Sequence, residues 1–253
     1  EQVLQWAIAA ERQDPQTLPW RTLKAVALSL LKRPHEALPE YRWLCAHAPN
    51  DAGHWSNLGN CLCELGQEYD ALEPLQKALL LGATEPALHF GLARAYAAQG
   101  QLELARRHIE TAIGRDPEDA EFPLLHLRIL QAMDRWPEAL ELARHLQSLP
   151  LDEGQRIDLG YLLFRGQWYE PALVQFSKPV QAPDLAIDAR IGRVMAFERT
   201  NRLAEARAEQ ALLSESATRH NPKLWQNFLQ MQAKMALREK RYPEARQLFE
   251  RCL

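Results

Sequence analysis

The residues that could do chemistry in this chain are its eight histidines and four cysteines. The histidines lie apart along the chain, and none forms the HExxH pattern that brings two zinc ligands and a general base onto one helix. Cys61 and Cys63 would point in different directions on a helix, and with Cys45 and Cys252 they fit neither a disulfide framework nor a zinc pattern. No glycine-rich loop suited to a phosphate is present. We therefore expect no catalytic, metal or cofactor site within these residues, and we expect the cysteines to be reduced and apolar in role.

The composition limits the classes of partner that the protein is expected to bind. A quarter of the 253 residues are charged, but the net charge is only -3, and a nucleic-acid-binding protein would need a basic excess. Hydrophobic residues make up 47 % of the chain, which is enough to bury a core. No uninterrupted apolar run approaches the roughly 18 residues that a membrane-spanning helix requires. We expect neither nucleic-acid binding nor membrane insertion.

The elements that would position any site come from an internal repeat of 34 residues. Trp55, Leu58 and Gly59 correspond to His89, Leu92 and Ala93, and the match continues through both stretches. An alanine recurs before the second apolar run of each unit: Ala37, Ala71, Ala105, Ala139, Ala172, Ala206 and Ala245. Apolar residues at three- and four-residue steps predict helices, and prolines predict the starts of several second helices.

This pattern resembles the tetratricopeptide repeat, a helix–turn–helix unit whose signature is an aromatic residue, Leu-Gly, Tyr, Ala, an aromatic residue, Ala and Pro. Residues 52–85 and 86–119 match it well, with Pro117 at the closing proline. The resemblance implies an all-α fold, a right-handed α-solenoid of tandem helix–turn–helix repeats in one continuous superhelix. We expect residues 1–17 to be the second helix of a preceding partial repeat. The expected units are 18–51, 52–85, 86–119, 120–152, 153–186, 187–225 and 226–253.

Three parts of the chain depart from the regular pattern. Pro179 is expected to shorten the second helix of the 153–186 unit. Five extra residues between Ala206 and Ala245 predict a longer helix or a loop near residues 214–223. Neither end shows a polar capping face, so the chain resembles a window from a longer array. The half-repeats at its ends could support self-association.

In proteins of this family, the first helix of each repeat lines the concave inner wall. Counted from each unit start, the inward residues are the second, fifth, ninth, twelfth and thirteenth. These places predict a basic run consisting of Arg94, Arg128, Arg165, Arg199, Lys234 and Arg238. They also predict an apolar line beside it, consisting of Phe90, Leu124, Ile157 and Ile191. Asn60 and Tyr161 complete the predicted peptide-binding groove, with Phe164 as a further aromatic residue near Tyr161.

These residues predict a non-catalytic protein–protein interaction scaffold whose groove binds a peptide segment with acidic and apolar side chains. Arginine suits this task because its planar fork can hold a carboxylate with two hydrogen bonds. The other interpretation is that the arginines are ordinary solvated surface, paired with Asp158, Asp188 and Glu198. Some chaperone-binding family members clamp a terminal carboxylate with Lys, Asn, Asn, Lys and Arg. Only Asn60 matches that set here, so binding of a chaperone C-terminus is not expected.

Two alternative functions follow from the same resemblance. The array could position a partner or substrate for a larger enzyme, such as a sulfotransferase or glycosyltransferase. It could instead be the periplasmic array of a polysaccharide-export protein. The arginine- and alanine-rich composition is typical of a bacterial protein. The location is expected to be cytoplasmic because no signal peptide is seen, although the chain begins at Glu1 rather than Met and a periplasmic location stays open.

Overall fold

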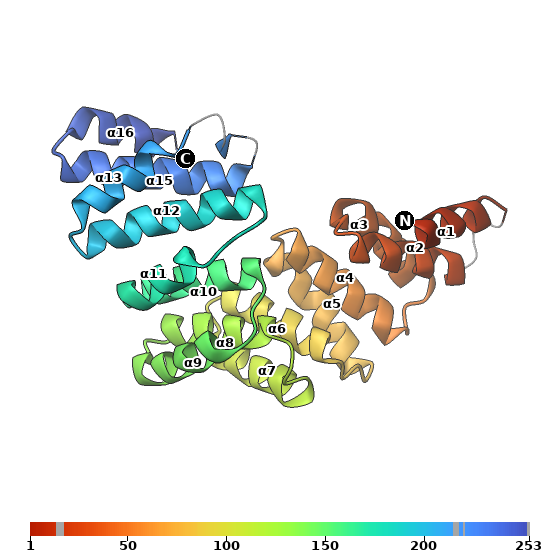
Figure 1. Ribbon diagram of the computed structural model, residues 1–253. Coiled ribbons are helices and arrows are strands. Elements are labelled where there is room, and N and C mark those ends of the chain that lie inside the picture. Colours follow the sequence, from red (N-terminus) through yellow and green to blue (C-terminus); the bar gives the residue numbers. More distant parts are fainter. Residues whose placement is uncertain (14–17, 215–217, 220, 252–253) are drawn as a thin grey trace. The chain divides into compact units, whose positions relative to one another are not determined.

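The computed structural model describes residues 1–13, 18–214, 218–219 and 221–251 (Figure 1). All regular elements in these described ranges are α-helices, as the sequence predicted. The chain forms two compact units, Glu1–Arg135 and Trp136–Leu253. Each unit is considered by itself below.

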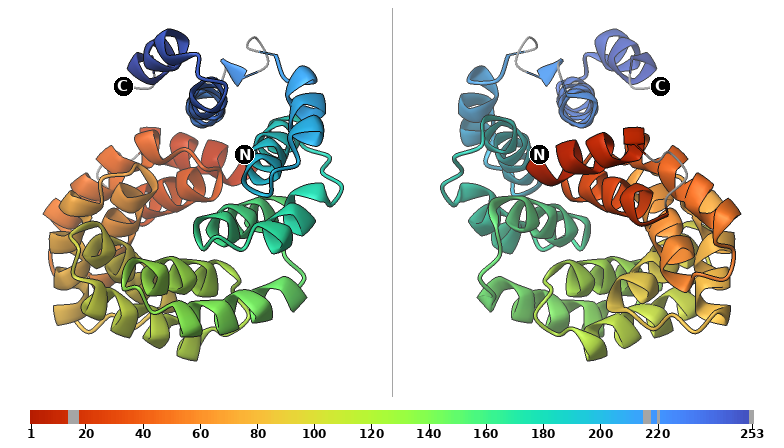
Figure 2. Two further views of the ribbon diagram at one scale, coloured as in Figure 1. Left: turned by 90° about the vertical axis from the view of Figure 1, so that its left-hand side faces the viewer. Right: turned by 90° about the vertical axis from the view of Figure 1, so that its right-hand side faces the viewer.

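The described part of the first unit contains eight helices, each packed against the next one in the sequence (Figures 1 and 2). They are α1 (Gln2–Gln13), α2 (Leu18–Leu30), α3 (Pro34–His47), α4 (Ala52–Glu64), α5 (Glu68–Leu80), α6 (Pro86–Ala98), α7 (Leu102–Arg115) and α8 (Glu121–Ala132). The first helices of successive repeats also touch, α4 against α6 and α6 against α8. This places one row of first helices beside one row of second helices, which is the arrangement expected of the repeat.

The second unit continues the same pattern with two longer helices. Its described helices are α9 (Trp136–Ser148), α10 (Glu153–Arg165), α11 (Tyr169–Ser177), α12 (Pro183–Arg199), α13 (Leu203–Ala211), α15 (Pro222–Arg238) and α16 (Tyr242–Glu250). The nine-residue α11 ends before Pro179, which confirms the predicted shortening. Helices α12 and α15 have 17 residues each and start at Pro183 and Pro222, not at the expected 187 and 226. A proline suits a first turn, where its missing N–H is not needed, so each helix gains about one turn.

One turn geometry ends seven first helices. The second residue after each helix has a positive φ, and these residues are Lys32, Gly66, Gly100, Asp134, Gln167, Asn201 and Lys240. The next N–H then donates to a carbonyl five residues back, as from Gln67 to Leu62 at 2.9 Å and from Trp168 to Leu163 at 2.9 Å. This is the Schellman motif, which satisfies carbonyls at a helix C-terminus. Its recurrence at the repeat spacing is the structural basis of the sequence period.

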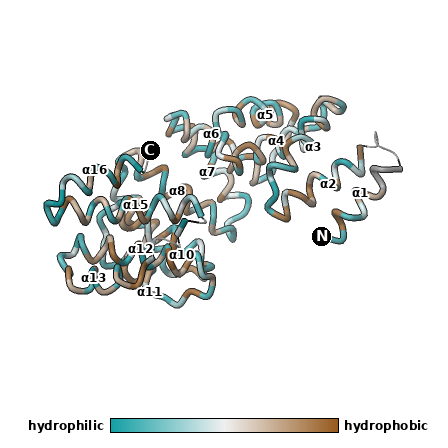
Figure 3. The backbone as a smooth tube through the Cα atoms, turned by 90° about the horizontal axis from the view of Figure 1, so that it is seen from above, coloured by the Kyte–Doolittle hydropathy of each residue, from teal (hydrophilic) through white to brown (hydrophobic). Residues whose placement is uncertain are grey.

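Glycines on the first helices let large side chains of the second helices pack against helix backbone. Leu75 of α5 lies between Gly59 of α4 and Gly91 of α6. Phe176 of α11 is held in the same way between Gly160 of α10 and Gly192 of α12. Both large side chains are fully buried. Figure 3 shows apolar and polar positions alternating along the helices, as expected when each helix buries one face.

The described cysteines have the expected apolar role. Cys45, Cys61 and Cys63 are free and buried, whereas Cys252 lies outside the described residues. Burial raises the pKa of Cys45 to about 12, of Cys61 to about 11 and of Cys63 to about 12. These thiols therefore stay protonated in the folded protein and behave as small hydrophobic groups. In the described ranges, no helix combines the length and apolar character needed to cross a membrane.

Candidate functional site

The first unit has a groove of about 680 Å³ on the inward side of α4 and α6. It brings together three of the predicted site residues, Asn60, Phe90 and Arg94. The ring of Phe90 packs against Phe122 of α8 with centroids 5.1 Å apart, which gives the groove an aromatic wall. The predicted places on these helices are therefore neighbours in space.

The cations of this groove are paired within the protein. Arg94 Nη2 donates to Glu68 Oε1 at 2.8 Å and to the Cys63 carbonyl at 2.6 Å. The Lys32 ammonium lies 3.6 Å from a Glu64 carboxylate oxygen. Asp119 and Glu121 add two further carboxylates to the lining. The expectation that Arg94 contributes to a basic wall is therefore wrong here, because nearby acidic side chains neutralise it.

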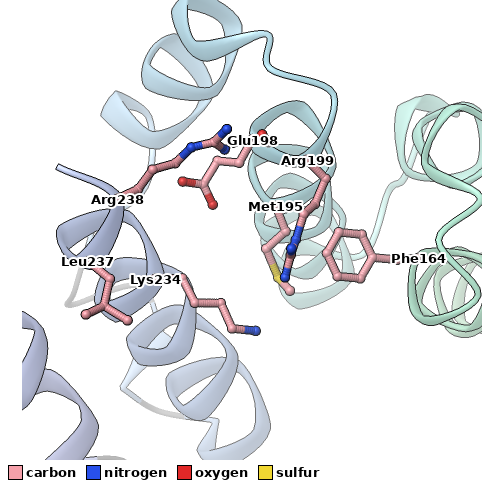
Figure 4. Close-up of a pocket in the computed structure, with 7 residues that line it drawn as sticks. All are labelled: Phe164, Met195, Glu198, Arg199, Lys234, Leu237 and Arg238. Carbon is pink, nitrogen blue, oxygen red and sulfur yellow. Dashed lines mark hydrogen bonds between the residues drawn. The ribbon is translucent and has the colours of Figure 1, made fainter. Parts of the chain in front are cut away.

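The second unit has a groove of about 450 Å³ between α12 and α15, with Phe164 of α10 at its edge (Figure 4). It brings together three predicted basic residues, Arg199, Lys234 and Arg238. Met195 and Leu237 supply apolar walls beside them. This groove combines the basic and apolar character that the sequence predicted for the inner wall.

The charges of this second groove are mostly not paired. Arg238 donates through Nη1 to the backbone carbonyl of Glu198. Within the described part of the chain, no acceptor lies within bonding distance of the Arg199 guanidinium or the Lys234 ammonium. Burial raises the pKa of Glu198, while Arg238, Arg199 and Lys234 act in the opposite direction. Three cations therefore surround one buried carboxylate.

Several predicted site residues lie elsewhere. Arg128 and Arg165 are exposed and line neither of these two grooves. Leu124, Ile157 and Ile191 are core residues with 6 %, 2 % and 0 % exposure, so three of the four residues of the predicted apolar line are not available at the surface. Phe90, the fourth, is half-buried and lines the groove of the first unit.

Tyr161 is half-buried and lines neither of these two grooves. Its hydroxyl donates to Asp188 Oδ1 at 2.6 Å, and Asn227 Nδ2 donates to the same oxygen at 3.0 Å. Burial, and then the Asp188 carboxylate, raise the pKa of Tyr161 well above its usual value. These three residues come from α10, α12 and α15, so the network fixes how three successive first helices stack.

Four of the groove residues share one position in the repeat. Cys63, Phe164, Glu198 and Leu237 are twelfth places, and each lines one of the two grooves. The twelfth place was among the expected inward positions, so the signal was present in the spacing. No group of three or more histidine, cysteine, aspartate or glutamate side chains arranged to hold a metal ion occurs in the ranges that the structure covers.

Comparisons with known proteins define the class. Residues 90–152 match the model of the tetratricopeptide repeat family. A tetratricopeptide repeat protein from Parabacteroides merdae has 15 % identity and a TM-score of 0.65, with 94 % of this chain and 92 % of that chain covered. Yeast Tom70 has 14 % identity and a TM-score of 0.64, with 98 % and 53 % covered. A comparison with curated protein sequences finds no significant match.

A third solved structure shares the fold over a shorter stretch. YrrB has 19 % identity and a TM-score of 0.54, with 77 % of this chain and 97 % of that chain covered. This chain therefore carries tetratricopeptide repeats, as its residue pattern indicated. The repeats define an all-α protein-interaction scaffold of a kind that is generally non-catalytic.

Proposed function

We propose that this chain binds a peptide segment of a partner protein on the inward sides of its first helices. In the proposed complex, carboxylates of the segment lie in the groove formed by Arg199, Lys234 and Arg238. The observation that carries this proposal is the convergence of Arg199 and Lys234, from two different helices, on one groove without acceptors in the described residues. A segment with acidic side chains would supply those acceptors.

The strength of such binding can be estimated from the groove composition. One exposed ion pair contributes only about 0.2–1 kcal/mol, so no single arginine would suffice. Three cations beside the apolar walls of Phe164, Met195 and Leu237 allow several pairs and apolar burial together. A micromolar complex corresponds to about -8 kcal/mol, which this combination can reach.

A solved relative supports the mode of binding. The structure of YrrB is described as that of a tetratricopeptide repeat protein with an unusual peptide-binding site. The likeness to this chain is one of fold, so the ligand chemistry proposed here rests on the groove residues alone. The cytoplasmic location expected from the sequence stays a prediction, with which three free cysteines agree.

The test is selection from a random peptide library displayed on phage, with the whole chain as bait. A second bait carries Arg199→Glu and Lys234→Glu, and a matched control carries Arg128→Glu and Arg165→Glu. Both variants change the net charge equally, but only the first alters the groove. Circular dichroism and thermal melting would first establish that all three baits are equally folded.

The proposal predicts that the unaltered chain and the control enrich the same peptides, which contain Asp or Glu beside apolar residues. The groove variant should lose them. The proposal is wrong if no peptides are enriched, or if the two variants retain or lose the peptides equally.

A further inference from the structure

Glu198 is an acidic residue in a groove whose other charged side chains attract anions. Its side chain points from α12 toward Arg238 and Lys234 on α15 (Figure 4). The residue is only 8 % exposed. Within the residues that the structure covers, no donor lies within hydrogen-bonding distance of its carboxylate, and no cation lies within ion-pairing distance. A groove that bound anions alone would not need this carboxylate.

A largely buried carboxylate without a protein donor is unfavourable, because it has lost much of its hydration without gaining a partner. Burial accordingly raises the pKa of Glu198, and the three nearby cations only partly oppose this. A ligand that brings an N–H or O–H donor to this oxygen would remove that penalty. The groove therefore has two demands, an anion for the cations and a hydrogen-bond donor for the carboxylate.

Simple ligands meet only one of the two demands. Sulfate would meet the cations, but at neutral pH it carries no N–H or O–H donor for Glu198. A lone ammonium or guanidinium group would suit Glu198, but it is repelled by Arg199, Lys234 and Arg238. An aspartate or glutamate within a peptide meets both demands, since its carboxylate is joined through a short chain to a backbone N–H.

We infer that Glu198 is the specificity-determining residue of this groove, accepting a backbone N–H from a peptide whose neighbouring acidic side chain pairs with Arg199 and Lys234. This inference rests on the proposed function and names the ligand of that same site. Phe164, Met195 and Leu237 then contact an apolar side chain next to the acidic one. Glu198 rejects small anions by repulsion, so the groove recognises acidic peptides and not anions in general.

The test uses the four methionine methyl groups as NMR reporters in the whole chain. Met195 lines the groove, and Met133 in the first unit reports binding elsewhere. One titrant is an acetylated and amidated peptide of five alternating leucine and aspartate residues. The other titrant is inorganic sulfate, an anion without a hydrogen-bond donor, at matched ionic strength. The variants are Glu198→Gln and Glu198→Asp, with Glu141→Gln as a control that changes the same charge at an exposed position of α9.

In the unaltered chain, the peptide should shift the Met195 signal at a concentration at which sulfate does not. Glu198→Gln should lower the ratio of peptide affinity to sulfate affinity by about tenfold or more, as expected for one charge-assisted hydrogen bond. Glu198→Asp keeps the charge but shortens the reach, so it should weaken peptide binding while still excluding sulfate. Glu141→Gln should leave the ratio unchanged.

The inference is overturned if sulfate binds the unaltered groove as well as the peptide does, or if Glu198→Gln leaves the ratio unchanged. It is also overturned if the peptide shifts Met133 alone or neither signal. Thermal melting of each variant excludes loss of folding as the cause. Such results would not contradict the proposed function, provided that the Arg199→Glu and Lys234→Glu bait still fails to enrich the library peptides.

Discussion

Replacing Gly192 with alanine tests how the second unit is packed. A Cβ at this position would lie 2.6 Å from both Cε1 and Cζ of Phe176, and 2.8 Å from Cδ1. Carbon atoms in contact are about 3.5–4.0 Å apart, so the ring would have to move by about 1 Å. It has no room to do so, because Gly160 lies against its other side and the side chain is fully buried.

The expected cost follows from two opposing effects. Overpacking a core typically costs about 1–3 kcal/mol, and the ring clamped on both sides favours the upper part of that range. Alanine also stabilises a helix by about 1 kcal/mol relative to glycine. We therefore expect Gly192→Ala to lower the free energy of unfolding by about 1–2 kcal/mol.

Gly114→Ala is the matched control for this substitution. Gly114 lies within α7, and a Cβ there would meet no atom within 4 Å. Only the helix-propensity effect remains, so this variant should gain about 1 kcal/mol. The two glycine substitutions should thus change stability in opposite directions.

Urea unfolding, monitored by circular dichroism, measures both effects. The Gly192→Ala substitution is also measured in a chain that carries Phe176→Leu. Leucine occupies the corresponding place at Leu75, and a Cβ at Gly91, the equivalent of Gly192, would lie 3.1 Å from the nearest carbon of that leucine, which is a milder clash. The cost of Gly192→Ala should therefore shrink in that background. The packing argument is refuted if Gly192→Ala is as stable as the unaltered chain, or if its cost is the same in both backgrounds.

Gln167, after α10, has a φ of 63°, which glycine adopts more readily than a residue with a Cβ. Gln167→Gly should therefore raise the free energy of unfolding, measured in urea, by about 0.5–1 kcal/mol. An unchanged free energy of unfolding would contradict the turn argument. Burial lowers the pKa of His89 and His108 below the usual 6.5, so the unfolded chain binds protons more readily than the folded one. The stability that these neutral rings contribute should be complete above about pH 6.5 and fall below it, and melting temperatures that do not fall there would refute this. Because burial raises the pKa of Cys45 and Cys63 to about 12, a thiol reagent should modify them far more slowly in the folded chain than in urea; equal rates would be the contrary result.

The fold could be predicted from the sequence because the same pattern of residues recurs in several repeats. The recurring alanines, such as Ala71 and Ala105, are fully buried where second helices pack. The turns at Gly66 and Gly100 fall at the same 34-residue spacing. The start of α12 was predicted less well, because the extra turn before residue 187 is set by Pro183, which lies outside the repeat pattern.

The site could be predicted only in part, since a repeat register fixes helix faces more coarsely than contacts. Successive residues on an α-helix are about 100° apart, so one place can face solvent while another expected inward place faces a neighbouring helix. Arg199 and Ile191 share α12, yet the first is exposed and the second is fully buried. Ion pairing is still harder to predict, because Glu68 neutralises Arg94 from 26 residues away.

The charges of the two grooves differ as a result, and this bears on the kind of partner that the proposed function requires. The groove of the first unit pairs its cations internally and adds the carboxylates of Asp119 and Glu121. The groove of the second unit leaves Arg199 and Lys234 without acceptors in the described residues. An acidic segment would therefore be attracted to the second groove and repelled by the first.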